Sequence, residues 1–166
     1  MQIEVKTFSE LTINALYDIL KLRCDVFVVE QECAYPELDE KDRHPETLHV
    51  SLLDDSGELI GYNRIVPPAL SYPEPSIGRV VVISSHRGKG LAAQVVKASI
   101  EVIHKQWPQR AIKIGAQEYL LRFYQSLGFQ NNSDMYLEDG IPHRDMILPY
   151  PNFHQKQYDG SNDRPA

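Results

Sequence analysis

The sequence predicts an α/β (α+β) protein with a mixed central sheet of about six to seven strands flanked by helices. Short runs with the alternating or β-branched character of strands are separated by amphipathic segments with helical spacing. The clearest unit is a strand, a glycine-rich turn, an amphipathic helix and a further strand. Such a crossover is right-handed and leaves its two strands parallel, which indicates a layered fold of helices packed on a sheet.

The N-terminal segment predicts a strand followed by a helix. Residues 2–6 alternate as a short strand, and Thr12 is a suitable cap for a helix whose apolar residues recur at helical spacing as far as Phe27. Residues 31–46 are acidic, aperiodic and interrupted by proline, as is typical of a surface loop. We expect this loop to border a site.

The middle of the chain predicts a hairpin, a buried strand and a long helix. Residues 47–53 and 58–66 are strand-like and are separated by an Asp-Asp-Ser-Gly turn. Residues 77–83 form a β-branched run that fits a buried strand. Residues 91–107 carry one apolar stripe, and Pro108 ends the helix that this stripe predicts.

The C-terminal part predicts one more strand, a short helix and a last hairpin. Residues 111–116 form the strand, and residues 118–127 form a helix that Gly128 ends. The hairpin is expected from residues 134–138 and 145–148.

Length and composition indicate one domain over residues 1–150 and a polar tail, residues 151–166, which we expect to be disordered. The net charge of −6 argues against a nucleic-acid partner, because such binding depends on clustered Lys and Arg. There is no apolar run of the roughly 20 residues that a bilayer requires, and no signal peptide is recognised, so we expect a cytoplasmic protein without a membrane partner. The histidines lack ligand spacing, so no metal is expected. An exposed sheet edge could support a homodimer.

The glycine-rich turn is a candidate anion site. Gly88 and Gly90 lie where a strand turns into a helix, so backbone N–H groups and the helix dipole can converge on a pyrophosphate. Arg87 and Lys89 add positive charge. Glycines at such turns also serve simply to adopt a positive φ, which leaves a structural role open. The order of residues excludes a P-loop, and a Rossmann fingerprint fits poorly because the turn follows the fourth predicted strand.

Two ordered motifs resemble those of the GNAT acetyltransferase superfamily. Val-Val-Val at 80–82 followed by Arg-Gly-Lys-Gly-Leu-Ala at 87–92 resembles its motif A. The segment from Gln117 through Phe-Tyr-Gln-Ser-Leu-Gly-Phe at 123–129 resembles its motif B. Further stretches near both ends resemble the ElaA-like branch, so the resemblance covers about residues 1–150. The chain departs from the family pattern at Ser85, where a long polar residue is usual, and at Gln117, where many members carry Asn.

The resemblance implies acetyl-CoA as a co-substrate. Its pantetheine arm would lie along the strand at 80–83 as an extra strand does, and its pyrophosphate would lie over residues 86–92. The implied contact residues are Val80, Val81, Val82, His86, Arg87, Gly88, Lys89, Gly90, Leu91, Ala92, Gln117 and Phe123.

The resemblance also implies direct transfer of an acetyl or short acyl group to a primary amine of an unidentified small molecule or protein. A backbone N–H near Val80 or Val81 is the expected oxyanion donor. Tyr124, a phenol with an ordinary pKa of about 10, is the expected general acid for the CoA thiolate. A tyrosine beside Phe123 and Leu127 on a short amphipathic helix could instead be simply part of the core.

An alkylamine arrives protonated at neutral pH, so a base must remove a proton. The candidates are Glu30 and His143. Glu30 follows an apolar run, so we expect partial burial and a raised pKa. His143 lies in a late Gly-Ile-Pro-His loop, and an imidazole exchanges protons near neutral pH. For each residue, a solvated or structural role is the alternative.

Two arginines in apolar segments, Arg23 and Arg64, could bind an acidic acceptor or pair internally with Asp25 or Glu30; internal pairing is favoured. The acidic residues 37–42 hint at a cationic acceptor. The alternative to an enzyme is a non-catalytic acyl-CoA-binding sensor or interaction protein.

Overall fold

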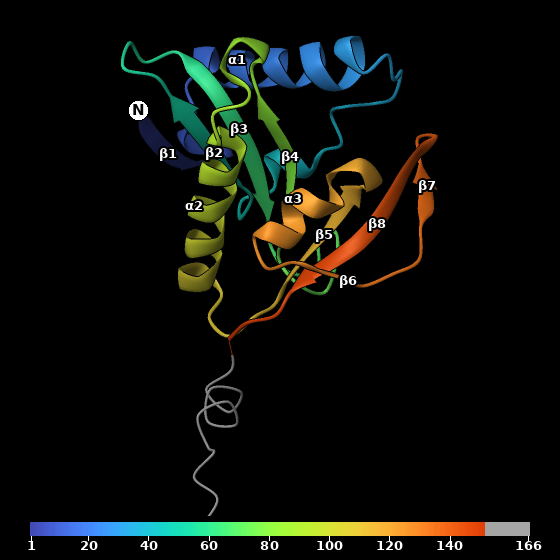
Figure 1. Cartoon of the computed structure of the whole chain (residues 1–166). Helices are drawn as coiled ribbons and strands as arrows, with labels where there is room; N and C mark the ends of the chain where they lie inside the picture. The colour runs from blue at the N-terminus through green and yellow to red at the C-terminus, as the bar shows by residue number, and fades with distance from the viewer. Residues whose placement is uncertain (152–166) are drawn as a thin grey trace, which may run out of the picture.

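The computed structural model describes residues 1–151, and the tail predicted to be disordered lies beyond these residues from position 152. Within the described part, eight strands and three α-helices are found (Figure 1). The strands are β1 (Gln2–Thr7), β2 (Leu48–Leu53), β3 (Leu59–Val66), β4 (Ser76–Val82), β5 (Ile112–Gln117), β6 (Gln130–Asn131), β7 (Tyr136–Glu138) and β8 (Ile141–Leu148). The helices are α1 (Ile13–Arg23), α2 (Leu91–Gln106) and α3 (Leu121–Ser126). None of the helices in residues 1–151 is long and apolar enough to cross a membrane.

The first sheet has the order β1-β2-β3-β4, and its neighbouring strands are all antiparallel. Its two faces are covered by different helices. The main core forms where the fully buried Val95, Val96 and Ile103 of α2 pack against it, and a smaller cluster joins Ile19 of α1 to Tyr62 and neighbours. The predicted hairpin and the predicted long helix are both confirmed, because apolar residues at period two and at helical spacing meet across this face.

The second sheet has the order β5-β8-β6, with β7 paired to β8. β4 and β5 point in the same direction in Figure 1, but among the described residues no ladder joins them. A single backbone hydrogen bond of 3.1 Å, from the N–H of Lys113 to the carbonyl of Pro75, links the places where the two strands begin. The strands therefore diverge toward their carboxyl ends, and the expected central sheet is divided at this seam.

A β-bulge lies in β4 beside this seam. Tyr62 is opposite Val81 and Arg64 is opposite Gly78, so one residue of β3 faces both Arg79 and Val80. Arg79 has a φ of 52°, in the left-handed region that side chains other than glycine rarely adopt. A bulge bends its strand and disrupts pairing locally, which accounts for the opening between the two sheets.

Several segments differ from the sequence prediction: β6 was not predicted as a strand, and the helix predicted over residues 118–127 begins as a 3-10 turn before α3. The first helix ends at Arg23 and continues as a π-helical segment, Cys24–Glu30, rather than as an α-helix through Phe27. β8 begins at Ile141, so the last hairpin turns tightly at Asp139 and Gly140, both with positive φ. The prediction began this strand four residues too late, because Pro142 and His143 interrupt its apolar pattern.

The loop at 31–46 also differs, since it is not wholly at the surface. Glu37 is 4% exposed and Asp42 is 5% exposed. Buried carboxylates require partners. The ion-pair partners of both carboxylates are arginines from α1, β3 and β4.

Candidate functional site: the cleft between the diverging strands

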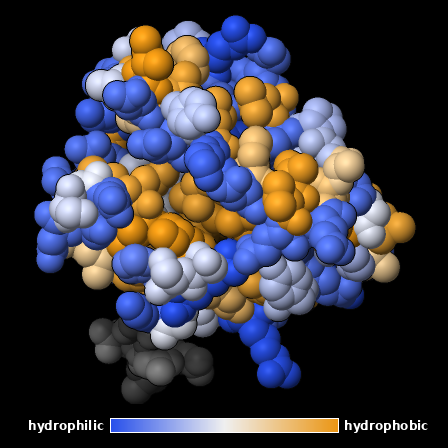
Figure 2. Space-filling model, turned by 90° about the horizontal axis from the view of Figure 1, so that it is seen from above, coloured by the Kyte–Doolittle hydropathy of each residue, from blue (hydrophilic) through white to orange (hydrophobic). Residues whose placement is uncertain are grey.

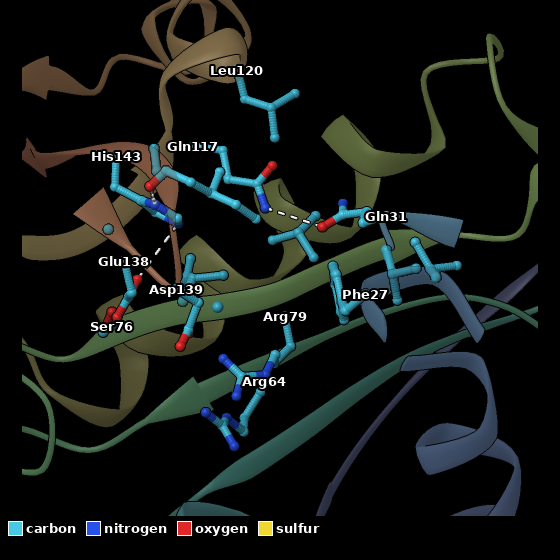
Figure 3. A pocket seen from close by; sticks show the side chains of 18 of the residues that line it. Phe27, Gln31, Arg64, Ser76, Arg79, Gln117, Leu120, Glu138, Asp139 and His143 are labelled. Atoms are coloured by element: carbon cyan, nitrogen blue, oxygen red, sulfur yellow. Dashed lines mark hydrogen bonds and ion pairs between the residues drawn. The ribbon is translucent and has the colours of Figure 1, made fainter. Parts of the chain in front are cut away.

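A cleft of about 850 Å³ opens between β4 and β5, a volume within the range of small-molecule pockets. Its walls come from β4, the π-helical segment, the start of α3 and the β7–β8 hairpin. Figure 2, seen from the side toward which both strands point in Figure 1, shows apolar surface gathered near the middle of this face and framed by hydrophilic residues. Across the cleft, the Gln117 side chain donates to that of Gln31 over 3.4 Å (Figure 3).

Most of the predicted site residues line this cleft. All three candidate catalytic residues do so, as do the implied contact residues Val80, Val81, Val82, Arg87, Ala92, Gln117 and Phe123. The remaining implied contacts, His86, Gly88, Lys89, Gly90 and Leu91, are not among its lining residues. Leu91 is 5% exposed and belongs to the core, so its side chain faces away from a ligand over the turn.

The glycine-rich turn has the backbone expected of an anion site. Gly88 and Gly90 have φ values of 78° and 75°, and Gly90 is the N-cap of the 16-residue α2. A Cβ built on either glycine meets nothing within 4 Å. The turn thus leaves its backbone open to solvent at the positive end of a helix dipole.

Tyr124 forms part of the cleft wall and is 7% exposed. Its ring packs edge-on against Phe123 and Phe129, with centroid distances of 5.0 and 5.8 Å. Burial raises the pKa of the Tyr124 phenol well above its ordinary value. The phenol is consequently protonated at neutral pH and can donate a hydrogen bond or a proton into the cleft.

Glu30 does not have the environment that the sequence predicted. Its side chain is 45% exposed and accepts two hydrogen bonds from the Arg87 guanidinium, at 2.8 and 2.7 Å. The hydrogen bonds from Arg87 lower the pKa of Glu30, whereas we expected burial to raise it. The prediction of a raised pKa is wrong because the carboxylate lies at the cleft mouth beside a cation.

His143 lies on β8 and is 8% exposed. Its Nδ1 is 2.7 Å from the carbonyl oxygen of Ile141, and its Nε2 is 3.5 Å from a carboxylate oxygen of Glu138 (Figure 3). The ring also stacks on Tyr136 at a centroid distance of 6.0 Å. Because a carbonyl only accepts, Nδ1 donates to Ile141, and Nε2 is the nitrogen that faces Glu138.

A closed ring of alternating charges lies at the other end of the cleft and was not predicted. Three arginines and three carboxylates, each contacting two partners, make up this charge ring. In order they are Arg23, Glu37, Arg79, Asp39, Arg64 and Asp42, with successive N–O distances of 2.8, 2.9, 3.4, 2.8 and 3.0 Å and a closing distance of 2.6 Å back to Arg23. The ring ties α1, the acidic loop, β3 and the β4 bulge together.

The ring lowers the pKa of two of its carboxylates, Asp39 and Asp42. Burial opposes ionisation of Asp39, but the hydrogen bonds from Arg64 outweigh it and lower the pKa of Asp39 to about 2. Burial likewise opposes ionisation of Asp42, and bonds from Arg23 and Arg64 lower its pKa. Each charge is therefore compensated within the protein.

The ring corrects two expectations. Internal pairing of Arg23 and Arg64 is confirmed, but their predicted partners are wrong, because Asp25 pairs with Lys21 and Glu30 pairs with Arg87. The acidic residues 37–42 are not a free surface for a cationic acceptor, since the three ring carboxylates among them are neutralised by arginines. One signal was available in the sequence, namely arginines in apolar segments together with a loop rich in carboxylates.

Comparisons with known proteins identify the family and the fold. A family model described as an acetyltransferase (GNAT) domain matches residues 18–149. Protein ElaA of Escherichia coli is 40% identical over 135 residues, which are 81% of this chain and 88% of that protein. A UPF0039 protein of Schizosaccharomyces pombe is 40% identical over 144 residues, or 86% of this chain and 93% of that protein. The crystal structure of an acyl-CoA N-acyltransferase from Pseudomonas aeruginosa matches with a TM-score of 0.83 and 36% identity, covering 88% of this chain and 97% of that one.

Proposed function

The chain belongs to the GNAT acetyltransferase family, and from this premise we propose that it transfers an acetyl or short acyl group from acetyl-CoA to a primary amine. The observation that carries the proposal is the cleft between β4 and β5, where the edge of β4 lies opposite a buried, protonated Tyr124. An acyl-CoA is a long, narrow ligand, and an unpaired strand edge is the surface along which such a ligand can hydrogen-bond as an added strand does.

The turn at Gly88 and Gly90 is the proposed site for the pyrophosphate of acetyl-CoA. Its backbone is open, and α2 directs the positive end of its dipole toward it. The pantetheine arm would then follow Val80, Val81 and Val82. Arg87 now binds Glu30, so in this proposal it exchanges a carboxylate for phosphate when the ligand arrives.

The proposed chemistry needs three contributions from the chain. The amine nitrogen attacks the thioester carbon, the C–N bond forms, and the carbonyl electron pair moves to oxygen, where a backbone N–H at Val80 or Val81 stabilises it. The carbonyl then re-forms and the C–S bond breaks, while Tyr124 gives its proton to the sulfur. The acceptor attacks as the neutral amine, after giving its first proton to water, and His143 accepts at Nε2 the proton that the nitrogen loses once the C–N bond has formed. Exchange with solvent returns both side chains to their starting state.

The proposal is tested by titrating the purified protein with acetyl-CoA and then measuring free thiol across polyamines, aminoglycosides, amino acids and peptides. Saturable binding followed by amine-dependent thiol release supports the transferase. Binding without release by any amine would favour a non-catalytic acyl-CoA-binding protein, and no binding would overturn both.

A further inference from the structure

We propose that the amine acceptor carries a carboxylate and that Lys41 and Arg79 hold it at the charge-ring end of the cleft. The acceptor class this describes is a small, amino-acid-like molecule. The inference rests on the proposed function, because it assigns the acceptor half of the same cleft.

The first observation is the uneven placement of the ring charges. Of its carboxylates, only Asp39 lines the cleft, while Glu37 and Asp42 lie buried behind it. Two of its arginines, Arg64 and Arg79, face the cleft. Figure 3 shows these two guanidinium groups close together on one side of the cleft. Although the charges of the ring balance, the cleft side of the ring is positive. The carboxylates of Glu37 and Asp42 lie farther from a ligand in the cleft than the two arginines do.

The second observation is a cation outside the ring. Lys41 also lines the cleft, and its ammonium donates to the hydroxyl of Ser71 over 2.8 Å. Among the described residues, no carboxylate lies within ion-pair distance of this ammonium. The ring needs no further cation for balance, so the Lys41 ammonium, which makes an exposed contact with Ser71, is available to a ligand. A bound carboxylate would pair with it.

The third observation is a free donor on Arg79. Its Nε donates to Glu37 at 2.9 Å, and its Nη2 contacts a carbonyl and Asp39. Its Nη1 has no hydrogen-bond partner in residues 1–151. The Arg79 side chain is 23% exposed, which leaves this N–H accessible from the cleft. Arginine and lysine donors together are the usual means of fixing a carboxylate.

The two walls of the cleft differ in the charge they present. Arg64, Arg79 and Lys41 line one end, and Arg79 directly precedes Val80, whose N–H is a proposed oxyanion donor. The opposite wall holds His143 with Glu138, where the amine would lose its proton (Figure 3). A short molecule with an amine at one end and a carboxylate at the other fits between walls of opposite character. Amino acids, which carry both an amine and a carboxylate, are the acceptor class that this arrangement describes.

The test compares binding of acids with that of their neutral amides. The full chain, with CoA present, is titrated by calorimetry with the N-acetyl derivatives of alanine, leucine, phenylalanine and glutamine, each against its amide. We expect at least one acid to bind about tenfold more tightly than its amide, as is typical for a charge-assisted contact. Equal affinities in every pair, or no binding by any acid, would overturn the inference.

The matched variants are Lys41→Met and Lys105→Met. Lys41→Met should remove most of the preference for the acid and leave the amide affinity unchanged. Lys105 lies in the last turn of α2 and outside the cleft, so Lys105→Met should preserve the preference. An unchanged preference in Lys41→Met would contradict the assignment. Binding and turnover are measured separately. Absence of thiol release with every amine would count against the proposed transferase. Equal affinity for each acid and its amide would count only against the proposed acceptor class.

Discussion

Tyr124 is the residue on which the proposed chemistry most depends. A phenol with a raised pKa stays protonated through the neutral range, so it is a proton donor rather than a base. The same wall places the Tyr124 side chain at the cleft, where a thiolate would leave in the proposed reaction.

Replacing Tyr124 with phenylalanine removes the hydroxyl and keeps the packing with Phe123 and Phe129. We expect turnover to fall by roughly a hundredfold or more, the usual contribution of a general acid, with little change in acetyl-CoA affinity. Steady-state thiol release and calorimetry measure the two effects. Tyr17→Phe is the control, because Tyr17 is 67% exposed and lies outside the cleft. Equal turnover in Tyr124→Phe and wild type would remove this residue from the mechanism.

We expect replacement of the two candidate bases, Glu30 and His143, to affect catalysis differently. Glu30 is held ionised by Arg87 at the cleft mouth, whereas His143 presents Nε2 from a buried ring. We expect His143→Asn to lower kcat by about tenfold or more. Glu30→Gln should keep kcat within about twofold and mainly change the affinity for acetyl-CoA, because it releases Arg87. Both values come from initial rates at varied acetyl-CoA, and a larger kcat loss in Glu30→Gln would reverse the assignment.

At the scale of elements, the glycine-rich turn is the feature that the sequence described best. Its two glycines do adopt positive φ, and the helix after it begins at the expected residue. The π-helical segment could not be predicted, because its apolar residues also satisfy α-helical spacing and only the hydrogen-bond pattern distinguishes the two.

Valine at Gly88 or Gly90 should weaken acetyl-CoA binding by about tenfold or more. The added side chain has room, so the effect comes from strain at positive φ, which reorients the N–H groups of the turn. Gly57→Val is a matched control, since Gly57 has a φ of 86°, open surroundings and a place in the β2–β3 turn away from the cleft. Calorimetry on all three variants measures affinity. Full affinity in Gly88→Val and Gly90→Val would count against the pyrophosphate site.

At the scale of the whole molecule, the sequence predicted the fold class and every strand except the two-residue β6, but only a minority of the residues that line the cleft. The motifs could be recognised because the backbone conformation there depends on neighbouring residues, as the positive φ of Gly88 and Gly90 does. The charge ring joins residues from position 23 to position 79. Single-sequence patterns identify unusual residues such as Arg23 but not their partners, because pairing depends on how distant elements pack. For the same reason, the burial of Glu37 and Asp42 in the acidic loop could not be predicted from the sequence.

The charge ring predicts how stability depends on pH. The carboxyls of Asp39 and Asp42 have lowered pKa values in the folded chain, with that of Asp39 at about 2. Since a carboxyl of an unfolded chain titrates near about 4, the ring's stabilisation is complete above this pH and is lost as pH falls toward about 2. The free energy of unfolding should therefore decrease over this interval.

Asp42→Asn tests this dependence directly. It leaves Arg23 and Arg64 buried with reduced compensation, so we expect a loss of about 3–5 kcal/mol in the free energy of unfolding at pH 7 and a weaker decline in acid. Urea unfolding at several pH values measures both. Asp25→Asn is the control, because Asp25 pairs with Lys21 at an exposed site and should change stability by less than about 1 kcal/mol. An Asp42→Asn chain as stable as wild type would contradict a stabilising ring.

The central claim is that the cleft between β4 and β5 holds an acyl-CoA, and backbone amide shifts on adding CoA to the labelled chain test it most directly. The account predicts saturable shifts at residues 80–82, 87–92 and 117–124, with little change in β1 and the exposed face of α1. Shifts confined to other elements, or none at millimolar CoA, would contradict it.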